Sequence, residues 1–122
     1  MDARAYFDRF ARAFEAADAD AIAAFFALPT LLTRGGVPTE IADAPALRAS
    51  IDQLLRVHAD ADVARIRAAG VVVLEEAEAH TVARVDWSLE RRGAGGPWRY
   101  ATTYVVLPDG RIAAALTHGS PF

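Results

Sequence analysis

Apolar residues recur at helical spacing in three segments of the first 60 residues. The first segment carries an apolar stripe at spacings of three and four: Tyr6, Phe7, Phe10, Phe14 and Ala17. Asp18 suits the N-cap of a second, short helix, which we expect Pro29 to end. Pro45 suits the start of a third helix, whose apolar face comprises Leu47, Ile51, Leu54, Leu55 and His58. The pattern therefore predicts three helices.

Beyond residue 60 the hydrophobic period changes from 3.6 to 2, which is typical of β-strands. Long strands are predicted over residues 62–74, 79–91, 98–107 and 111–118, and a short strand over 30–33. Gly70 is expected to form a bulge, and Pro108 with Gly110 predicts a tight hairpin. Arg34, Gly35 and Gly36 are read as a turn, and residues 92–96 as a glycine-rich hairpin loop. The fold class is α+β, with three N-terminal helices on one face of a curved, mainly antiparallel sheet.

Composition narrows the class of protein further. A chain of 122 residues that is 53% hydrophobic is expected to form one domain over residues 1–122. The absence of cysteine excludes a disulfide scaffold and a thiol nucleophile. The net charge is −3 and the chain contains no lysine, so we expect no nucleic-acid partner. No apolar stretch has the length of a membrane span or a signal peptide, so we expect a cytoplasmic protein without a membrane partner.

The order of these elements resembles the nuclear transport factor 2-like superfamily, over essentially the whole chain. The positions that carry the resemblance are residues 14–18 and 24–29, Val85-Asp86-Trp87, Tyr104 and residues 109–112. The resemblance implies a cystatin-like cone, in which helices and a curved sheet enclose a cavity. Members include ketosteroid isomerase, polyketide cyclases, epoxide hydrolases and non-catalytic association modules, so the fold leaves the function open.

Two members of this superfamily can be compared residue by residue. If Asp18 is placed on the acid of ketosteroid isomerase, Phe10 replaces the oxyanion tyrosine and Arg34 replaces the base, so that chemistry is not supported. Arg84-Val85-Asp86 is similar to the Arg-x-Asp pair of limonene-type epoxide hydrolases, but the second acid falls near Thr117, which has no carboxyl group. The alternative interpretation of Arg84 and Asp86 is a surface ion pair on a strand whose other face forms the core.

Histidines and aromatic side chains supply the remaining candidates. His118, with Asp86 and Arg84, is a candidate catalytic residue, and its strand face is predicted to include Ile112 and Leu116. The candidate substrate-binding residues are Tyr104, His58, Trp87, Phe10 and Phe14. His58 is alternatively a partner of the helix C-terminal carbonyls, and the two phenylalanines alternatively belong to the core. No metal site or cofactor is expected, because the histidines show no metal-binding spacing.

The leading functional hypothesis is a pocket that binds or transforms a small, mostly apolar organic molecule, as in an isomerase or cyclase. The alternatives are an epoxide-hydrolase relative with an incomplete set of acids and a non-catalytic association module. A homodimer through the sheet is expected in each case, because large residues are predicted on both strand faces, with Trp87 and Leu89 on one and Trp98, Tyr100 and Tyr104 on the other. Convergence of Asp86, Tyr104 and His118 on an enclosed cavity would support an enzyme. A cone filled by phenylalanines would favour association.

Overall fold

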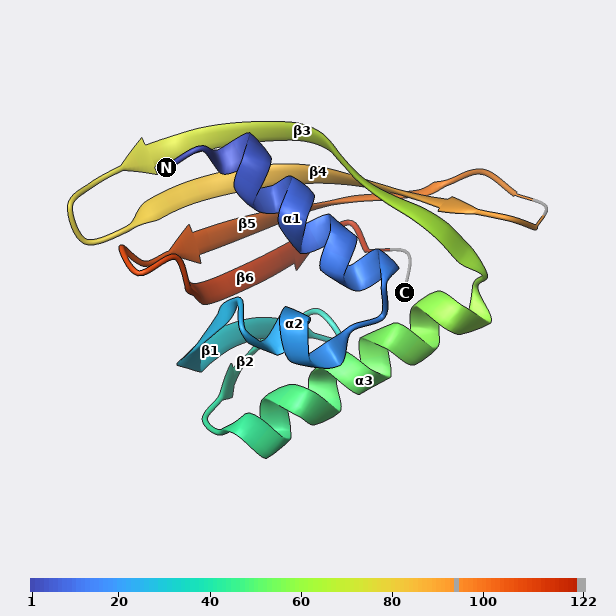
Figure 1. Ribbon diagram of the computed structural model, residues 1–122, viewed down its shortest axis with the longest axis horizontal. Helices are drawn as coiled ribbons and strands as arrows, with labels where there is room; N and C mark the ends of the chain where they lie inside the picture. Colours follow the sequence, from blue (N-terminus) through green and yellow to red (C-terminus); the bar gives the residue numbers. More distant parts are fainter. Residues whose placement is uncertain (94, 121–122) are drawn as a thin grey trace.

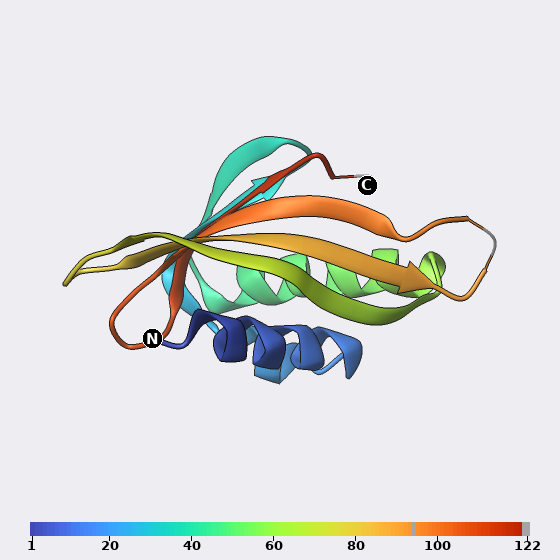
Figure 2. The ribbon, with the colours of Figure 1, turned by 90° about the horizontal axis from the view of Figure 1, so that it is seen from above.

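The computed structural model describes residues 1–93 and 95–120, which form helices packed against one curved sheet (Figure 1). The helices are α1 (Ala3–Glu15), α2 (Ala19–Ala23) and α3 (Ala44–Asp60). The strands are β1 (Phe26–Arg34), β2 (Val37–Ile41), β3 (Val63–Glu76), β4 (Thr81–Arg91), β5 (Trp98–Val106) and β6 (Ile112–His118). Figure 2 shows all three helices on the same side of the sheet. The predicted α+β class is confirmed.

The six strands are arranged in the order β2-β1-β6-β5-β4-β3. All neighbouring strands are antiparallel except β1 and β6, which are parallel. The parallel pair arises because β1 precedes α3 and the long β3–β4–β5–β6 meander returns to lie beside it. We call the side covered by helices the helix-covered face and the other side the open face.

Each helix begins at an aspartate that accepts a hydrogen bond from a backbone N–H of the first turn. Asp2 accepts from Ala5 at 3.0 Å, Asp18 from Ala21 at 3.1 Å and Asp43 from Ala46 at 2.9 Å. Such caps satisfy backbone donors that have no partner within the helix. The predicted cap at Asp18 is therefore confirmed.

The N-terminal part of the sheet differs from the prediction. Helix α2 ends at Ala23 rather than at Pro29, and Phe26 and Pro29 lie in β1. Proline is accommodated there because the register between β1 and β6 shifts between Phe26 and Leu31, so the regular ladder does not require its missing N–H. Strand β2 was not predicted; its Pro38 obscured the alternating pattern.

Glycines form the turns and the bulge that the sequence indicates. Gly35 and Gly36 join β1 to β2 with φ of 56° and 80°, as a two-residue hairpin turn requires. Gly110 has a φ of 84° between β5 and β6, and its N–H donates to the carbonyl of Leu107. The register of β3 against β4 shifts between Ala68 and Gly70, which confirms the bulge. Ala94, in the predicted glycine-rich loop, lies outside the described residues.

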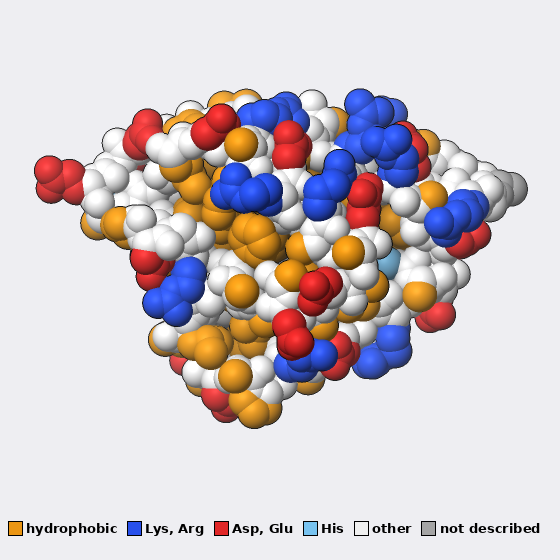
Figure 3. Space-filling view, in the orientation of Figure 1, with side chains coloured by type: hydrophobic (Ala, Val, Ile, Leu, Met, Phe, Trp, Pro, Cys, Tyr) orange, Lys and Arg blue, Asp and Glu red, His pale blue; other side chains and the backbone are white. Residues whose placement is uncertain are grey.

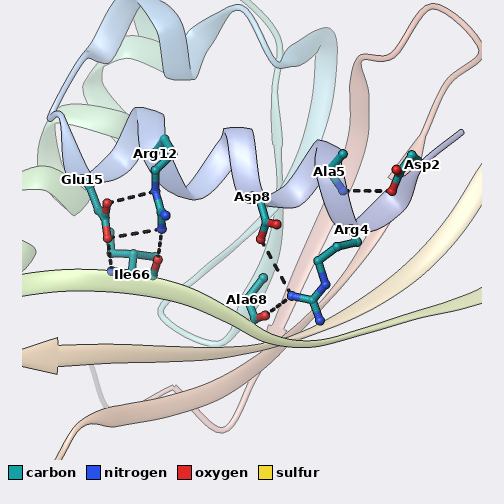
Figure 4. Close-up of polar contacts among 8 residues, drawn as sticks. All are labelled: Asp2, Arg4, Ala5, Asp8, Arg12, Glu15, Ile66 and Ala68. Atoms are coloured by element: carbon teal, nitrogen blue, oxygen red, sulfur yellow. Dashed lines mark hydrogen bonds and ion pairs between the residues drawn. The ribbon is translucent and has the colours of Figure 1, made fainter.

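Polar side chains of α1 cover the backbone of the edge strand β3 (Figure 4). The guanidinium of Arg12 donates to the carbonyl of Ile66 at 2.5 Å, and the Glu15 carboxylate accepts the Ile66 N–H at 2.7 Å. In the first turn of α1, Arg4 donates to the carbonyl of Ala68. Unpaired backbone groups on an edge strand invite pairing with another chain. These contacts close part of that edge and fix α1 across the sheet.

Two further properties concern the residues that the structure describes. None of their helices is long and apolar enough to span a bilayer. They also contain no cluster of three or more His, Cys, Asp or Glu side chains that could hold a metal ion.

Candidate functional site

The strand register places the large aromatic residues of β4 and β5 on the same face of the sheet. Trp87 lies opposite Tyr100, and Leu89 lies opposite Trp98. Because residues paired across strands share a face, all of these rings and Tyr104 belong to the helix-covered face. The prediction that these residues occupy opposite faces is wrong. The argument for a dimer from large residues on both faces therefore no longer holds.

Aromatic rings fill most of the space between α1 and the sheet. Phe10 is 4% exposed, and its ring makes contacts with six others, at centroid distances of 5.0–6.4 Å: Phe7, Phe14, Phe25, Phe26, Trp87 and Tyr104. Such a cluster combines apolar burial with favourable edge-to-face geometry. Phe10 is therefore a core residue, in agreement with the alternative interpretation given above.

Tyr104 and Trp87 are also part of this packed interior. The indole Nε1–H of Trp87 donates to the hydroxyl of Tyr104 at 3.0 Å. Burial raises the pKa of Tyr104 far above its ordinary value, so the hydroxyl stays protonated. Both polar groups thus satisfy each other within the core, and neither is directed toward solvent.

A small cavity remains at one end of the helix-covered face, between the C-terminal ends of α1 and α3 and the start of β3. We call it the helix-side cavity; its volume is about 180 Å³. Its walls are mostly apolar and come from Phe14, Ala17, Leu55, Ala59, Val63, Ala64 and Ile66. His58 and Glu15 add two polar side chains. Figure 3, which views this side of the molecule, shows charged side chains of both signs over the surface with apolar side chains between them.

His58 is buried in the last turn of α3, two residues before the helix ends. Its ring centroid lies 5.9 Å from that of Phe14 on α1. Burial lowers the pKa of His58 to about 4, because the charged imidazolium is poorly solvated there. At neutral pH the side chain is therefore an uncharged imidazole. Glu15, the other polar group of the cavity, is held by Arg12 at 2.9 Å and by the Ile66 N–H.

The candidate catalytic residues Arg84, Asp86 and His118 lie on the open face. The side chains of Arg84 and Asp86 form an ion pair at 3.1 Å, and each is about half exposed. Behind them, Ala83, Val85 and Leu89 are completely buried in the core. This arrangement matches the surface ion pair that was the alternative to a catalytic role for these two residues. Asp86 and His118 do not converge with Tyr104, which lies on the other side of the sheet.

A shift in strand register explains the position of His118. The pairing of β5 with β6 shifts where Val105 and Val106 meet Ala114 and Ile112. Ile112 is therefore buried under the helices, whereas Leu116 and His118 lie on the open face. The prediction that Ile112 and His118 share a face is wrong, because an extra residue in a strand reverses the alternation.

The open face holds a broad groove of about 740 Å³. Its lining includes Arg84, Asp86 and His118, together with Arg67, Ser88 and Arg99, which the sequence analysis did not single out. We call it the open-face groove. His118 Nε2 lies 3.1 Å from the Thr103 hydroxyl at its side. The sequence held a signal for the missed residues, because Arg67 and Arg99 occupy outward positions of predicted strands. Only the register between the strands brings them together.

The sequence and fold were compared with known proteins. A family model described as "NTF2-like protein (DUF6841)" matches residues 1–116. No curated protein matches the sequence. The fold is similar to a structure from Sinorhizobium meliloti described as a polyketide cyclase, with 18% identity, a TM-score of 0.68 and coverage of 93% of this chain and 94% of that chain.

Two other similar structures carry different descriptions. One, from Methylobium petroleophilum, is a protein of unknown function with a cystatin-like fold; it has 13% identity, a TM-score of 0.70 and coverage of 97% of this chain and 76% of that chain. The other, from Xanthomonas campestris, is described as a calcium/calmodulin dependent protein kinase II association domain; it has 15% identity, a TM-score of 0.69 and coverage of 96% and 84%. At these identities the likeness shows the fold alone.

Proposed function

This chain belongs to the NTF2-like family DUF6841, and we propose that it binds a small, neutral, mostly apolar molecule in the helix-side cavity. The observation that carries the proposal is an apolar cavity left open at the end of an otherwise filled helix-covered face. Apolar cavities with a few polar groups are the usual form of a small-molecule site.

Size and charge define the class of ligand. A cavity of about 180 Å³ is close to the roughly 150 Å³ that holds a benzene molecule in an engineered protein core. It is smaller than the roughly 300–1,000 Å³ of sites for drug-sized molecules. The neutral imidazole of His58 and the Arg12-paired carboxylate of Glu15 leave no net charge for an ion to neutralise. The favoured ligand is therefore neutral and about the size of one ring.

The positions of the titratable groups favour binding over acid–base catalysis. A general base works best when its pKa is near the operating pH, whereas the pKa of His58 is about 4. Asp86 and Arg84, the pair similar to that of epoxide hydrolases, face away from the helix-side cavity. An isomerase, cyclase or epoxide hydrolase acting in this cavity would thus lack the acid–base groups that the sequence suggested.

The test is to fill the cavity with a side chain and measure binding of toluene and indole by NMR chemical shifts. Ala59 is exposed and lines the cavity, so Ala59→Trp should weaken binding at least about tenfold while the melting temperature changes little. Ala49→Trp makes the same change at an exposed position about 15 Å away along α3 and should leave binding unchanged. Equal binding by the parent and Ala59→Trp would refute the proposal.

Self-association is a second candidate function, because one row of the open face is apolar across four adjacent strands. The row consists of Val82 on β4, Val105 on β5, Ala114 on β6 and Leu31 on β1. All four side chains are only half-buried, and no helix covers this side in Figure 2. We propose a second copy of the chain as the cover, since packing two such rows together removes apolar surface from water.

Sedimentation velocity at micromolar concentration tests this candidate. The parent is expected to sediment as a dimer, and Val105→Glu as a monomer, because the carboxylate would lose its hydration in the interface. Val37→Glu is the matched control: Val37 is 61% exposed and lies on the β1–β2 hairpin outside the apolar row, so this variant should remain dimeric. A monomeric parent would exclude self-association as the function.

A further inference from the structure

We propose that the open-face groove binds a small organic anion whose oxyanion group, a carboxylate or a phosphate, is held between Arg67 and Arg99 above Ser88. This site lies on the opposite side of the sheet from the helix-side cavity, so it does not depend on the ligand proposed there. It would give the open face a binding function of its own.

The strand register sets the three residues in one row. Arg67 on β3 pairs with Ser88 on β4, and Ser88 pairs with Arg99 on β5. Adjacent strands are about 4.8 Å apart, so the two arginine Cα atoms are separated by about 10 Å, with the short serine side chain between them. Two long side chains at this separation can both reach an anion above the serine. Guanidinium groups bind carboxylate and phosphate through paired N–H donors, and the serine hydroxyl adds one more.

The two guanidinium groups have donors to spare. Among residues 1–93 and 95–120, Arg99 forms no ion pair. Arg67 contacts Glu90 at 3.7 Å, which is long for a charge-assisted hydrogen bond, and its side chain is 61% exposed. An incoming oxyanion therefore need not displace a short, buried ion pair.

Asp86 is the carboxylate in the lining of this groove, and its contacts limit its repulsion of an anion. Its Oδ1 accepts from both Nε and Nη2 of Arg84, at 3.2 Å and 3.1 Å. The Asp86 carboxylate leans over Gly70, where an added Cβ would lie 3.0 Å from Oδ2. Arg84 thus balances Asp86, and Glu90 offsets Arg67 only at 3.7 Å, so the charge of Arg99 remains in excess at the groove, on a chain whose net charge is −3.

The shape of the groove also fits a small molecule. Ser88 between the arginines and Ala101 in the next row have small side chains, which leaves room for a ligand above the sheet. The volume of about 740 Å³ lies within the range of small-molecule sites. The body of the anion can therefore extend over the next row of the sheet, toward Asp86 and His118.

Calorimetric titration at low ionic strength, with inorganic phosphate, benzoate and succinate as separate probes, tests the site. At least one probe is expected to saturate the parent with a dissociation constant of about 1 mM or lower. Arg99→Gln and Arg67→Gln should each weaken that probe by about tenfold. Arg56→Gln removes an exposed arginine of α3 and should leave binding unchanged. Binding of phosphate alone would assign a phosphate-bearing ligand, and binding of benzoate or succinate alone a carboxylate.

A substitution that tightens anion binding distinguishes an anion site from a general destabilisation of the sheet. Asp86→Asn removes the negative charge of the groove, so it should tighten binding of the same probe several-fold. Melting temperatures show whether each variant is folded. The proposal is overturned if no probe saturates below about 10 mM, if Arg56→Gln weakens binding as much as Arg99→Gln, or if Asp86→Asn weakens it.

Discussion

Replacement of Phe10 by alanine is expected to lower the free energy of unfolding by about 3–5 kcal/mol. Phe10 is 4% exposed and lies at the centre of the aromatic cluster between α1, β1 and the sheet. The variant loses the transfer free energy of the ring and leaves a cavity that the surrounding rings cannot fill, because they are held by one another and by the Trp87–Tyr104 hydrogen bond. Urea unfolding followed by circular dichroism measures the change.

Two further variants make this measurement specific. Phe10→Leu keeps most of the apolar volume and should cost clearly less than Phe10→Ala. Val37→Ala removes an exposed apolar side chain and should change the free energy of unfolding by no more than about 0.5 kcal/mol. A cost below about 1 kcal/mol for Phe10→Ala would mean that the helix-covered face is not tightly packed, and a larger ligand cavity would then have to be considered.

The helices, the long strands and the turns could be predicted from the sequence, because their signals are local. Asp18 precedes a short apolar segment, and Gly110 follows a proline and an aspartate in a hairpin. These residues satisfy backbone donors or adopt positive φ within a few positions, so no tertiary information is needed. The alternation of β4 was equally clear: Ala83, Val85 and Leu89 are buried, and the charged residues between them are exposed.

The faces of the sheet could not be predicted, because they depend on register between strands. One bulge near Ala113 reverses the alternation of β6, so Ile112 and His118 end on opposite faces. The pairing of Trp87 with Tyr100 likewise puts on one face two rings that were predicted on opposite faces. The same limitation hid Arg67 and Arg99, which are 32 positions apart in the chain and become neighbours only through Ser88.

Acidification is expected to destabilise the protein through His58. The pKa of this imidazole is lowered from 6.5 to about 4 by burial, so the unfolded state binds a proton at a higher pH than the folded state does. The stability from this histidine is fully present above pH 6.5 and is lost as the pH falls through the interval from 6.5 to 4. A difference of this size corresponds to about 3 kcal/mol between pH 7 and pH 4. Urea unfolding at several pH values measures the slope of the free energy of unfolding against pH.

Carboxylates also contribute to acid unfolding, so the slope must be assigned by substitution. Glu15 lines the same cavity as His58 and forms an ion pair with Arg12 at 2.9 Å. His58→Gln and His58→Leu both remove the titrating imidazole and should flatten the curve between pH 6.5 and pH 4. His80→Gln, at a half-buried histidine bonded to Glu75, should retain the steep slope. If the two His58 variants keep the slope of the parent, His58 is not buried as a neutral imidazole, and the charge-free cavity proposed for a neutral ligand loses its basis.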